Sequence, residues 1–209
     1  MRISKSSSIL TLVFILVLLG LFLMIPKDIE SANVSSEVLK DYNSLLEESV
    51  NALETENYSK SKRKLDEAAL LLWNSSPLTA ENVTFLEKEA NFYGDIIPKE
   101  DKNYQPGDKL LLYLEPKNYL IEANQDGKYK IDMILDTKLI FEDGTIVFHN
   151  PKFIRFKKES SQPNQEVKFD MFFNLNSGLN SGEYTIKNTL IDKLSGDEVV
   201  IESKFKFNK

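Results

Sequence analysis

The spacing of hydrophobic residues changes twice along this chain of 209 residues. Residues 9–25 form an apolar run without a single charged side chain. From Val38 to about residue 92, apolar residues recur every three or four positions, which predicts amphipathic helices. From residue 99 onward, apolar and polar residues alternate, which predicts β-strands. The sequence therefore predicts an apolar helical segment, a helical region and a β-domain, in that order.

The apolar run at residues 9–25 has the length of a membrane-spanning helix. At about 1.5 Å per residue it would extend about 26 Å, close to the thickness of the hydrocarbon core of a bilayer. Arg2 and Lys5 precede it, so residues 1–8 should stay in the cytoplasm and the rest of the chain should lie outside. We expect a single-pass signal anchor in the cell membrane. A cleaved signal peptide, which would make the protein secreted, and a buried core helix are the alternatives.

Three helices are expected in the helical region, residues 35–95. Ser35 or Ser36 would cap the first helix, and Thr79 would cap the third. The apolar stripes comprise Val38, Leu39, Tyr42, Leu45, Leu46, Val50 and Leu53, then Tyr58, Leu65, Ala68, Ala69, Leu72 and Trp73, then Val83, Phe85, Leu86, Ala90 and Phe92. One helical hairpin cannot bury such stripes by itself. They must therefore dock on the β-domain, on the bilayer or on another protein.

The first two helices resemble a single tetratricopeptide-type repeat. The packing positions of that repeat are occupied by Leu45, Ala52, Tyr58, Leu65 and Ala68, and Ser61 replaces its usual small alanine. Only one unit is visible, whereas such repeats need neighbours to bury their faces. An ordinary amphipathic hairpin accounts for the same pattern.

Seven or eight strands at intervals of roughly ten residues are expected in residues 99–209, as in an antiparallel β-sandwich. Asp143-Gly144 separates two apolar runs, which is a strong signal for a β-hairpin. The last strand alternates most regularly, with Val199, Ile201, Ser203, Phe205 and Phe207 on one face.

The two ends of this domain resemble extracytoplasmic immunoglobulin-like (fibronectin-type) modules. Residues 104–118, YQPGDKLLLYLEPKN, are similar to the first strand of those modules, and residues 182–207 to their terminal hairpin. The resemblance implies a module for binding, spacing or assembly, and it carries no functional residues. The expected fold class is α+β, with an N-terminal transmembrane helix, a short helical hairpin plus one helix, and an antiparallel immunoglobulin-like β-sandwich.

Composition argues against most kinds of catalytic and metal site. The chain has no cysteine, and its one histidine is His149. Thiolate metal sites, disulfides and multi-histidine sites within one chain are therefore excluded. Residues 1–25 carry two basic side chains and no acidic one, so the remainder has a formal net charge of −8. This charge disfavours nucleic acid as a partner.

Two sequence patterns contain residue types that can act in catalysis or bind a metal ion. Ser59–Lys62 and Ser61–Lys64 both match a Ser-x-x-Lys pattern, but they lie on a charged helix face without a companion motif. Asp192, Asp197 and Glu198 surround a turn and offer three carboxylates to a calcium ion. A polar hairpin turn needs no ion, so we expect neither catalysis nor a bound metal or cofactor.

Two single residues are better explained by structure than by chemistry. His149 follows a predicted strand and is expected to be a solvent-facing turn residue rather than a general base. Trp73, the only tryptophan, lies among leucines and is expected to pack in a core rather than to stack on a sugar.

One basic cluster with interleaved aromatic residues is the candidate interaction patch. It comprises Lys152, Phe153, Arg155, Phe156, Lys157 and Lys158. These residues suit an acidic partner; alternatively, the lysines protect a strand edge from pairing. We expect a non-enzymatic, membrane-anchored extracytoplasmic protein that binds a protein partner or its own copies, as an accessory or structural envelope component. The alternative is a secreted or anchored module that binds a glycan or calcium.

Overall fold

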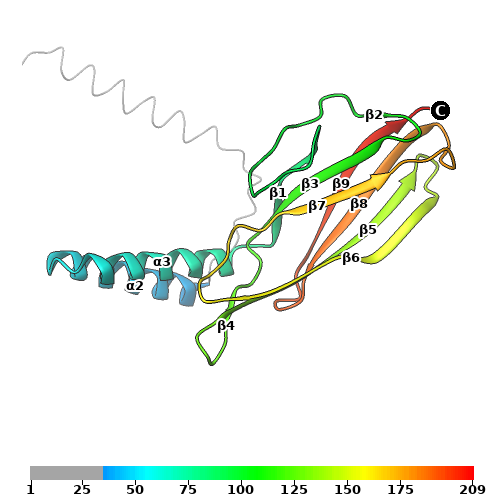
Figure 1. Ribbon diagram of the computed structural model, residues 1–209. Coiled ribbons are helices and arrows are strands. Elements are labelled where there is room, and N and C mark those ends of the chain that lie inside the picture. Colours follow the sequence, from blue (N-terminus) through cyan, green and yellow to red (C-terminus); the bar gives the residue numbers. More distant parts are fainter. Residues whose placement is uncertain (1–34) are drawn as a thin grey trace, which may run out of the picture. The chain divides into compact units, whose positions relative to one another are not determined.

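A computed structural model of the protein describes residues 35–209, and residues 36–209 form one compact unit (Figure 1). The expected transmembrane segment at residues 9–25 lies outside the described part of the chain. Within residues 35–209, no helix combines the length and the apolar character that crossing a bilayer requires.

Two helices joined by a short turn begin the described chain: α2 (Ser36–Glu54) and α3 (Tyr58–Ser75). Asn57 caps α3, because its side-chain oxygen accepts a hydrogen bond from the backbone N–H of Lys60 at 3.1 Å. The helices meet through small residues that are buried, namely Ser49, Ala52, Ser61 and Ala68. The first two predicted helices are thus confirmed.

The third predicted helix is wrong. Residues Thr79–Phe85 form strand β1, which pairs antiparallel with β3 (Lys109–Lys117). Val83 and Thr84 are β-branched and suit a strand, and β3 satisfies the backbone hydrogen bonds of β1. The apolar residues that follow belong to an irregular segment, residues 86–98, which packs on the outer side of β3.

The β-domain contains two sheets. The remaining strands are β2 (Asn103–Tyr104), β4 (Glu122–Ala123), β5 (Tyr129–Phe141), β6 (Ile146–Ser160), β7 (Phe169–Asn174), β8 (Gly182–Asp192) and β9 (Glu198–Phe207). The smaller sheet has three strands in the order β1-β3-β7. The larger has six, in the order β2-β9-β8-β5-β4, with β6 also paired to β5. Figure 1 shows the long strands β5, β6, β8 and β9 side by side.

The predicted immunoglobulin-like β-sandwich is wrong, and with it the expected fold class. Two irregularities in the β5–β6 register, after Leu135 and after Leu139, bend this long pair, and the larger sheet is a curled half-barrel. The predicted hairpins within the domain are confirmed: β5 and β6 are joined at Asp143-Gly144, where Gly144 has φ +88°, and β8 pairs with β9. Local alternation identified strands, whereas their distribution between sheets follows from tertiary packing.

One hydrophobic core joins the two sheets and the end of the helical hairpin. Tyr184 of β8 stacks on Phe205 of β9 at 5.4 Å between ring centroids, and Phe85 of β1 contacts Phe205 at 6.3 Å. Trp73 of α3 reaches this core: its indole N–H donates to the carbonyl of Tyr119 at 2.8 Å. The hairpin is therefore attached to the β-domain through α3. The expectation that Trp73 packs rather than stacks on a ligand agrees with this placement.

Candidate interaction surface

β6 is an edge strand of 15 residues. Among the described strands, it pairs only with β5, and β7 of the smaller sheet pairs only with β3. An edge strand presents backbone N–H and C=O groups that can pair with an additional strand. The predicted interaction patch lies on this strand.

The first three residues of β6 are apolar and unusually exposed. Ile146, Val147 and Phe148 keep 54%, 43% and 37% of their surface accessible. The Phe148 ring contacts the Phe153 ring at 6.1 Å and the Phe173 ring of β7 at 6.2 Å, and Phe153 stacks on Phe173 at 5.3 Å. This aromatic group holds the two sheets together beside an exposed apolar stretch, which is the kind of surface that marks interaction sites.

The second half of β6 is basic on its exposed side. Arg155 lies 3.9 Å from the carboxylate of Asp132 on β5. Lys152, Lys157 and Lys158 are exposed and form no ion pair with other described residues. Their charges are therefore available to an acidic partner.

The structure divides the six predicted patch residues into two groups. The four basic side chains are exposed, whereas Phe153 and Phe156 are half-buried. Phe156 packs on Phe169 of β7, with 6.1 Å between ring centroids. Sequence reasoning missed Ile146–Phe148, although three consecutive apolar residues at the start of an otherwise polar strand were a usable signal.

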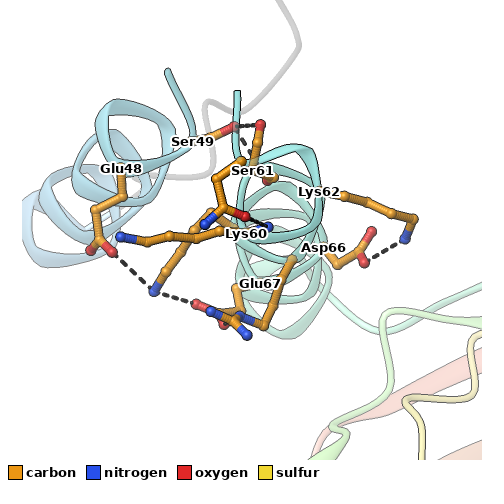
Figure 2. Close-up of polar contacts among 10 residues, drawn as sticks. Glu48, Ser49, Lys60, Ser61, Lys62, Asp66 and Glu67 are labelled. Atoms are coloured by element: carbon orange, nitrogen blue, oxygen red, sulfur yellow. Dashed lines mark hydrogen bonds and ion pairs between the residues drawn. The ribbon is translucent and has the colours of Figure 1, made fainter. Parts of the chain in front are cut away.

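The second Ser-x-x-Lys pattern does not form a serine–lysine pair. The hydroxyl of Ser61 is buried and lies 2.8 Å from that of Ser49 on α2 (Figure 2). The Lys64 ammonium contacts the carboxylates of Glu67 at 2.9 Å and Glu48 at 3.1 Å. Hydrogen bonds to Glu67 and Glu48 raise the pKa of Lys64, whereas a lysine that acts as a base needs a lowered pKa.

The first Ser-x-x-Lys pattern is equally unsuited to catalysis. Lys62 forms an ion pair with Asp66 at 2.6 Å, one helical turn further along α3 (Figure 2). Ser59 is exposed on the same helix. These residues are the charged outer face of α3.

The remaining candidates occupy ordinary structural positions. His149 is exposed on β6, with its Nε2 atom 3.1 Å from the carboxylate of Asp136. The carboxylate of Asp192 is buried and accepts hydrogen bonds from the backbone N–H groups of Leu120 at 2.6 Å and Leu194 at 2.9 Å. Among the described residues, no group of three or more acidic or histidine side chains is arranged to hold a metal ion.

A buried polar cluster on β3 was not anticipated from the sequence. Glu115 is only 2% exposed, and its carboxylate accepts hydrogen bonds from Tyr113 at 2.7 Å and Asn82 at 3.0 Å. The Lys117 ammonium lies 3.1 Å from the same carboxylate. Burial alone would raise the pKa of Glu115, but these hydrogen bonds outweigh it and lower the pKa.

This cluster attaches the irregular segment of residues 86–98 to β3. The backbone N–H of Gly94 donates to the Tyr113 hydroxyl at 2.9 Å, and Lys117 contacts the hydroxyl of Tyr93. Its polar atoms are thus used within the chain. The only usable signal was the pair Glu115 and Lys117 at the end of a strand that is otherwise apolar after Lys109.

No family model and no curated protein matches the chain. Some solved structures show weak similarity. A family 123 glycoside hydrolase from Clostridium perfringens gives a TM-score of 0.39 at 9% identity, covering 64% of this chain and 28% of that one. An alkylpurine DNA glycosylase from Pseudomonas fluorescens gives 0.36 at 7% identity, covering 75% and 40%. A Niemann-Pick type C2 protein from the Japanese carpenter ant gives 0.37 at 4% identity, covering 64% and 94%.

The chain thus spans less than half the length of the first two of these structures. At such low TM-scores and identities, the similarities carry no functional argument, and function has to be argued from the residues of this chain.

Proposed function

We propose that this chain is a non-enzymatic extracytoplasmic protein, held at the membrane by residues 9–25, that binds another protein through β6. The anchor rests on the apolar run and on the two basic residues before it. The binding role rests on one observation: a long edge strand that begins with three exposed apolar residues and whose second half carries Lys157 and Lys158, which form no ion pair with other described residues.

The chemistry of β6 describes the segment it would bind. A partner strand added along this edge would gain backbone hydrogen bonds, as in β-strand addition. Apolar side chains of the partner would lie beside Ile146–Phe148, and acidic side chains beside Lys157 and Lys158. The lysines also disfavour parallel, in-register pairing between two β6 edges, because like charges would then meet.

The contacts of the candidate catalytic groups support the non-enzymatic part of the proposal. The lysines of both Ser-x-x-Lys patterns are paired with carboxylates. The Asp192 carboxylate accepts hydrogen bonds from the backbone of Leu194, in the adjacent turn, and of Leu120.

Site-specific crosslinking of the full-length protein in its native membrane tests this proposal. A photo-crosslinking residue at position 147 or 157 should capture one partner protein. The control position is Thr189 on β8, a strand flanked by β5 and β9. The same residue there should capture nothing. Equal capture at all three positions, or none at 147 and 157, would show that β6 is not the binding edge.

A charge reversal tests the acidic character of the partner. Lys157→Glu with Lys158→Glu should reduce partner recovery at least tenfold. Lys206→Glu with Lys209→Glu makes the same change in net charge at exposed positions on and just after β9, and it should leave recovery unchanged. If both pairs reduce recovery equally, the effect is one of overall charge and not of β6.

A further inference from the structure

Besides the residues through which they meet, α2 and α3 each have a row of apolar side chains that do not pack against the other helix. On α2, Leu39, Val50 and Leu53 are 54%, 53% and 47% exposed. On α3, Tyr58, Leu65 and Leu72 are 68%, 47% and 41% exposed. We call these six residues, together with Leu46, the open face of the hairpin. So many exposed large apolar side chains on one short hairpin indicate a surface that is covered in the functional protein.

The open face repeats every seven residues on both helices. Leu39, Leu46 and Leu53 are separated by seven positions, and so are Tyr58, Leu65 and Leu72. Seven residues make two helical turns, so each set forms one line along its helix. This period is typical of helices that pack against other helices, and it therefore favours a helical partner over a bilayer or a sheet.

The two lines lie on the same side of the hairpin. Ser49 contacts Ser61, and Glu48 contacts Lys64, which sets an antiparallel pairing. Successive residues are about 100° apart around a helix axis. Measured around its own axis, each line lies roughly 40–100° from the direction of the contact between the helices, and both lines lie on the same side of the hairpin. The pairing also brings the members of the two lines to matching levels. The resulting layers are Leu39 with Leu72, Leu46 with Leu65, and Leu53 with Tyr58.

We propose that the hairpins of two copies of this chain pack open face to open face and form a four-helix bundle. The net charges of the two helices favour one way of pairing the helices of the two copies. Among the side chains of α2, acids exceed bases by four, and on α3 bases exceed acids by two. Packing α2 against α3 of the second copy brings opposite charges together, whereas α2 against α2 brings together two acidic helices.

The start of the described chain favours the same arrangement. Residues 1–34 lead directly into α2. A two-fold axis along the bundle places both α2 N-termini at one end, so that both chains can enter one membrane with a short connection. An axis across the bundle would place them at opposite ends. This step rests on the proposed function, because it assumes the membrane anchor.

The size of the open face indicates a weak dimer. Two helices of this length present a strip about 28 Å long and roughly 20 Å wide, so the dimer would bury on the order of 1,000 Å² in total. That is near the lower limit for a specific interface. Confinement of both copies to a membrane raises their effective concentration, so the dimer belongs in the membrane rather than in dilute solution.

Disulfide trapping in membranes tests the proposal directly, since the natural chain has no cysteine. Leu39→Cys and Leu72→Cys would be introduced into two differently tagged full-length copies, expressed together and oxidised in isolated membranes. We expect a disulfide-linked pair that contains both tags, at least fivefold more abundant than the pair formed by either variant alone. The control is Asn51→Cys, an exposed position on the opposite side of α2, which should form no pair.

Leu65→Glu, introduced into both tagged copies, is the second test. It changes an exposed position and should abolish the 39–72 disulfide while the β-domain keeps its resistance to protease. A predominant 39–39 disulfide would overturn the proposed arrangement. If the cysteine variants give no pair, or couple only to another protein, self-association is wrong. Capture at position 147 in the same membranes reports on β6 separately, so failure of the dimer and failure of the proposed function are distinguishable.

Discussion

Tyr113 and Glu115 are two residues apart on β3 and so lie on the same side of the strand, where the tyrosine hydroxyl donates a 2.7 Å hydrogen bond to the carboxylate. Burial, with the carboxylate of Glu115 as an additional cause, raises the pKa of Tyr113 to about 12. The pair lies on the side of β3 that residues 86–98 cover. The pair helps to hold residues 86–98 against β3. This segment is irregular, and no regular ladder of hydrogen bonds determines its position.

Glu115→Gln should destabilise the protein by about 2–3 kcal/mol near neutral pH, because Lys117 loses its buried partner. The pKa of Glu115 is lowered in the folded state. Its contribution to stability is therefore present above the unfolded pKa, about 4.3, and is lost as the pH falls through the folded value. Urea unfolding of both proteins between pH 3 and 7 measures this. The difference between them should shrink on acidification, and a constant difference would contradict this account.

Trp73→Phe should loosen the hairpin from the β-domain. It removes the donor to the Tyr119 carbonyl and should cost about 1–2 kcal/mol. Asn74→Ala should act in the same direction, because Asn74 exchanges two 3.1 Å hydrogen bonds with the backbone of Ile121. Amide hydrogen exchange of α3 measures the effect. Lys60→Ala, an exposed change on α3 outside the open face, is the control and should leave α3 exchange nearly unaltered.

Ser61→Leu should separate α2 from α3, because its side chain is buried where the helices meet through small residues. Overpacking of this kind costs about 1–3 kcal/mol. Ser61→Ala should cost less than about 1 kcal/mol, since the Ser49 hydroxyl can still donate to the Ser61 carbonyl. Ser59→Leu is the matched exposed control. Thermal unfolding distinguishes the three variants, and equal effects of both leucine substitutions would contradict the prediction.

Phe153→Ala should destabilise the contact between the two sheets by about 2–3 kcal/mol, because it removes the stacking partner of Phe173. Phe172→Ala should cost less than about 1 kcal/mol, since that ring is 57% exposed. Urea unfolding measures both. The reverse order would mean that Phe153 contributes mainly to surface recognition and not to packing.

Local patterns predicted α2 and α3 correctly, because a three-to-four-residue apolar period is a property of the segment itself. The cap of α3 at Asn57 was not predicted from the sequence. Local patterns failed at residues 79–92. Val83, Phe85, Leu86 and Ala90 satisfy a helical spacing almost as well as a strand, and the presence of β3 as a pairing partner decides for the strand. The same limit applies to the predicted immunoglobulin-like sandwich, whose strands were recognisable although their partners were not.

The candidate interaction surface, too, could be predicted from the sequence only in part. The clustering of basic residues between Lys152 and Lys158 located this part of the surface, and the sequence also predicted the β5–β6 hairpin at Asp143-Gly144. That β6 is an edge strand, and that Phe153 points inward while Lys157 stays exposed, depends on which strands are neighbours. The Glu115 cluster depends on Asn82 and Tyr93, which are distant in sequence.

By itself, the sequence of this protein determined the local properties: the helical hairpin, the tight β-turns, the absence of cysteine chemistry and the sign of the charge on β6. These depend on backbone preferences and on side chains within a few residues of one another. Only the tertiary structure decided the division into a half-barrel and a three-stranded sheet, the burial of Glu115 and the open face of the hairpin. Those features depend on which distant segments compete to cover the same apolar surface, and that competition is settled by the packing of the whole chain.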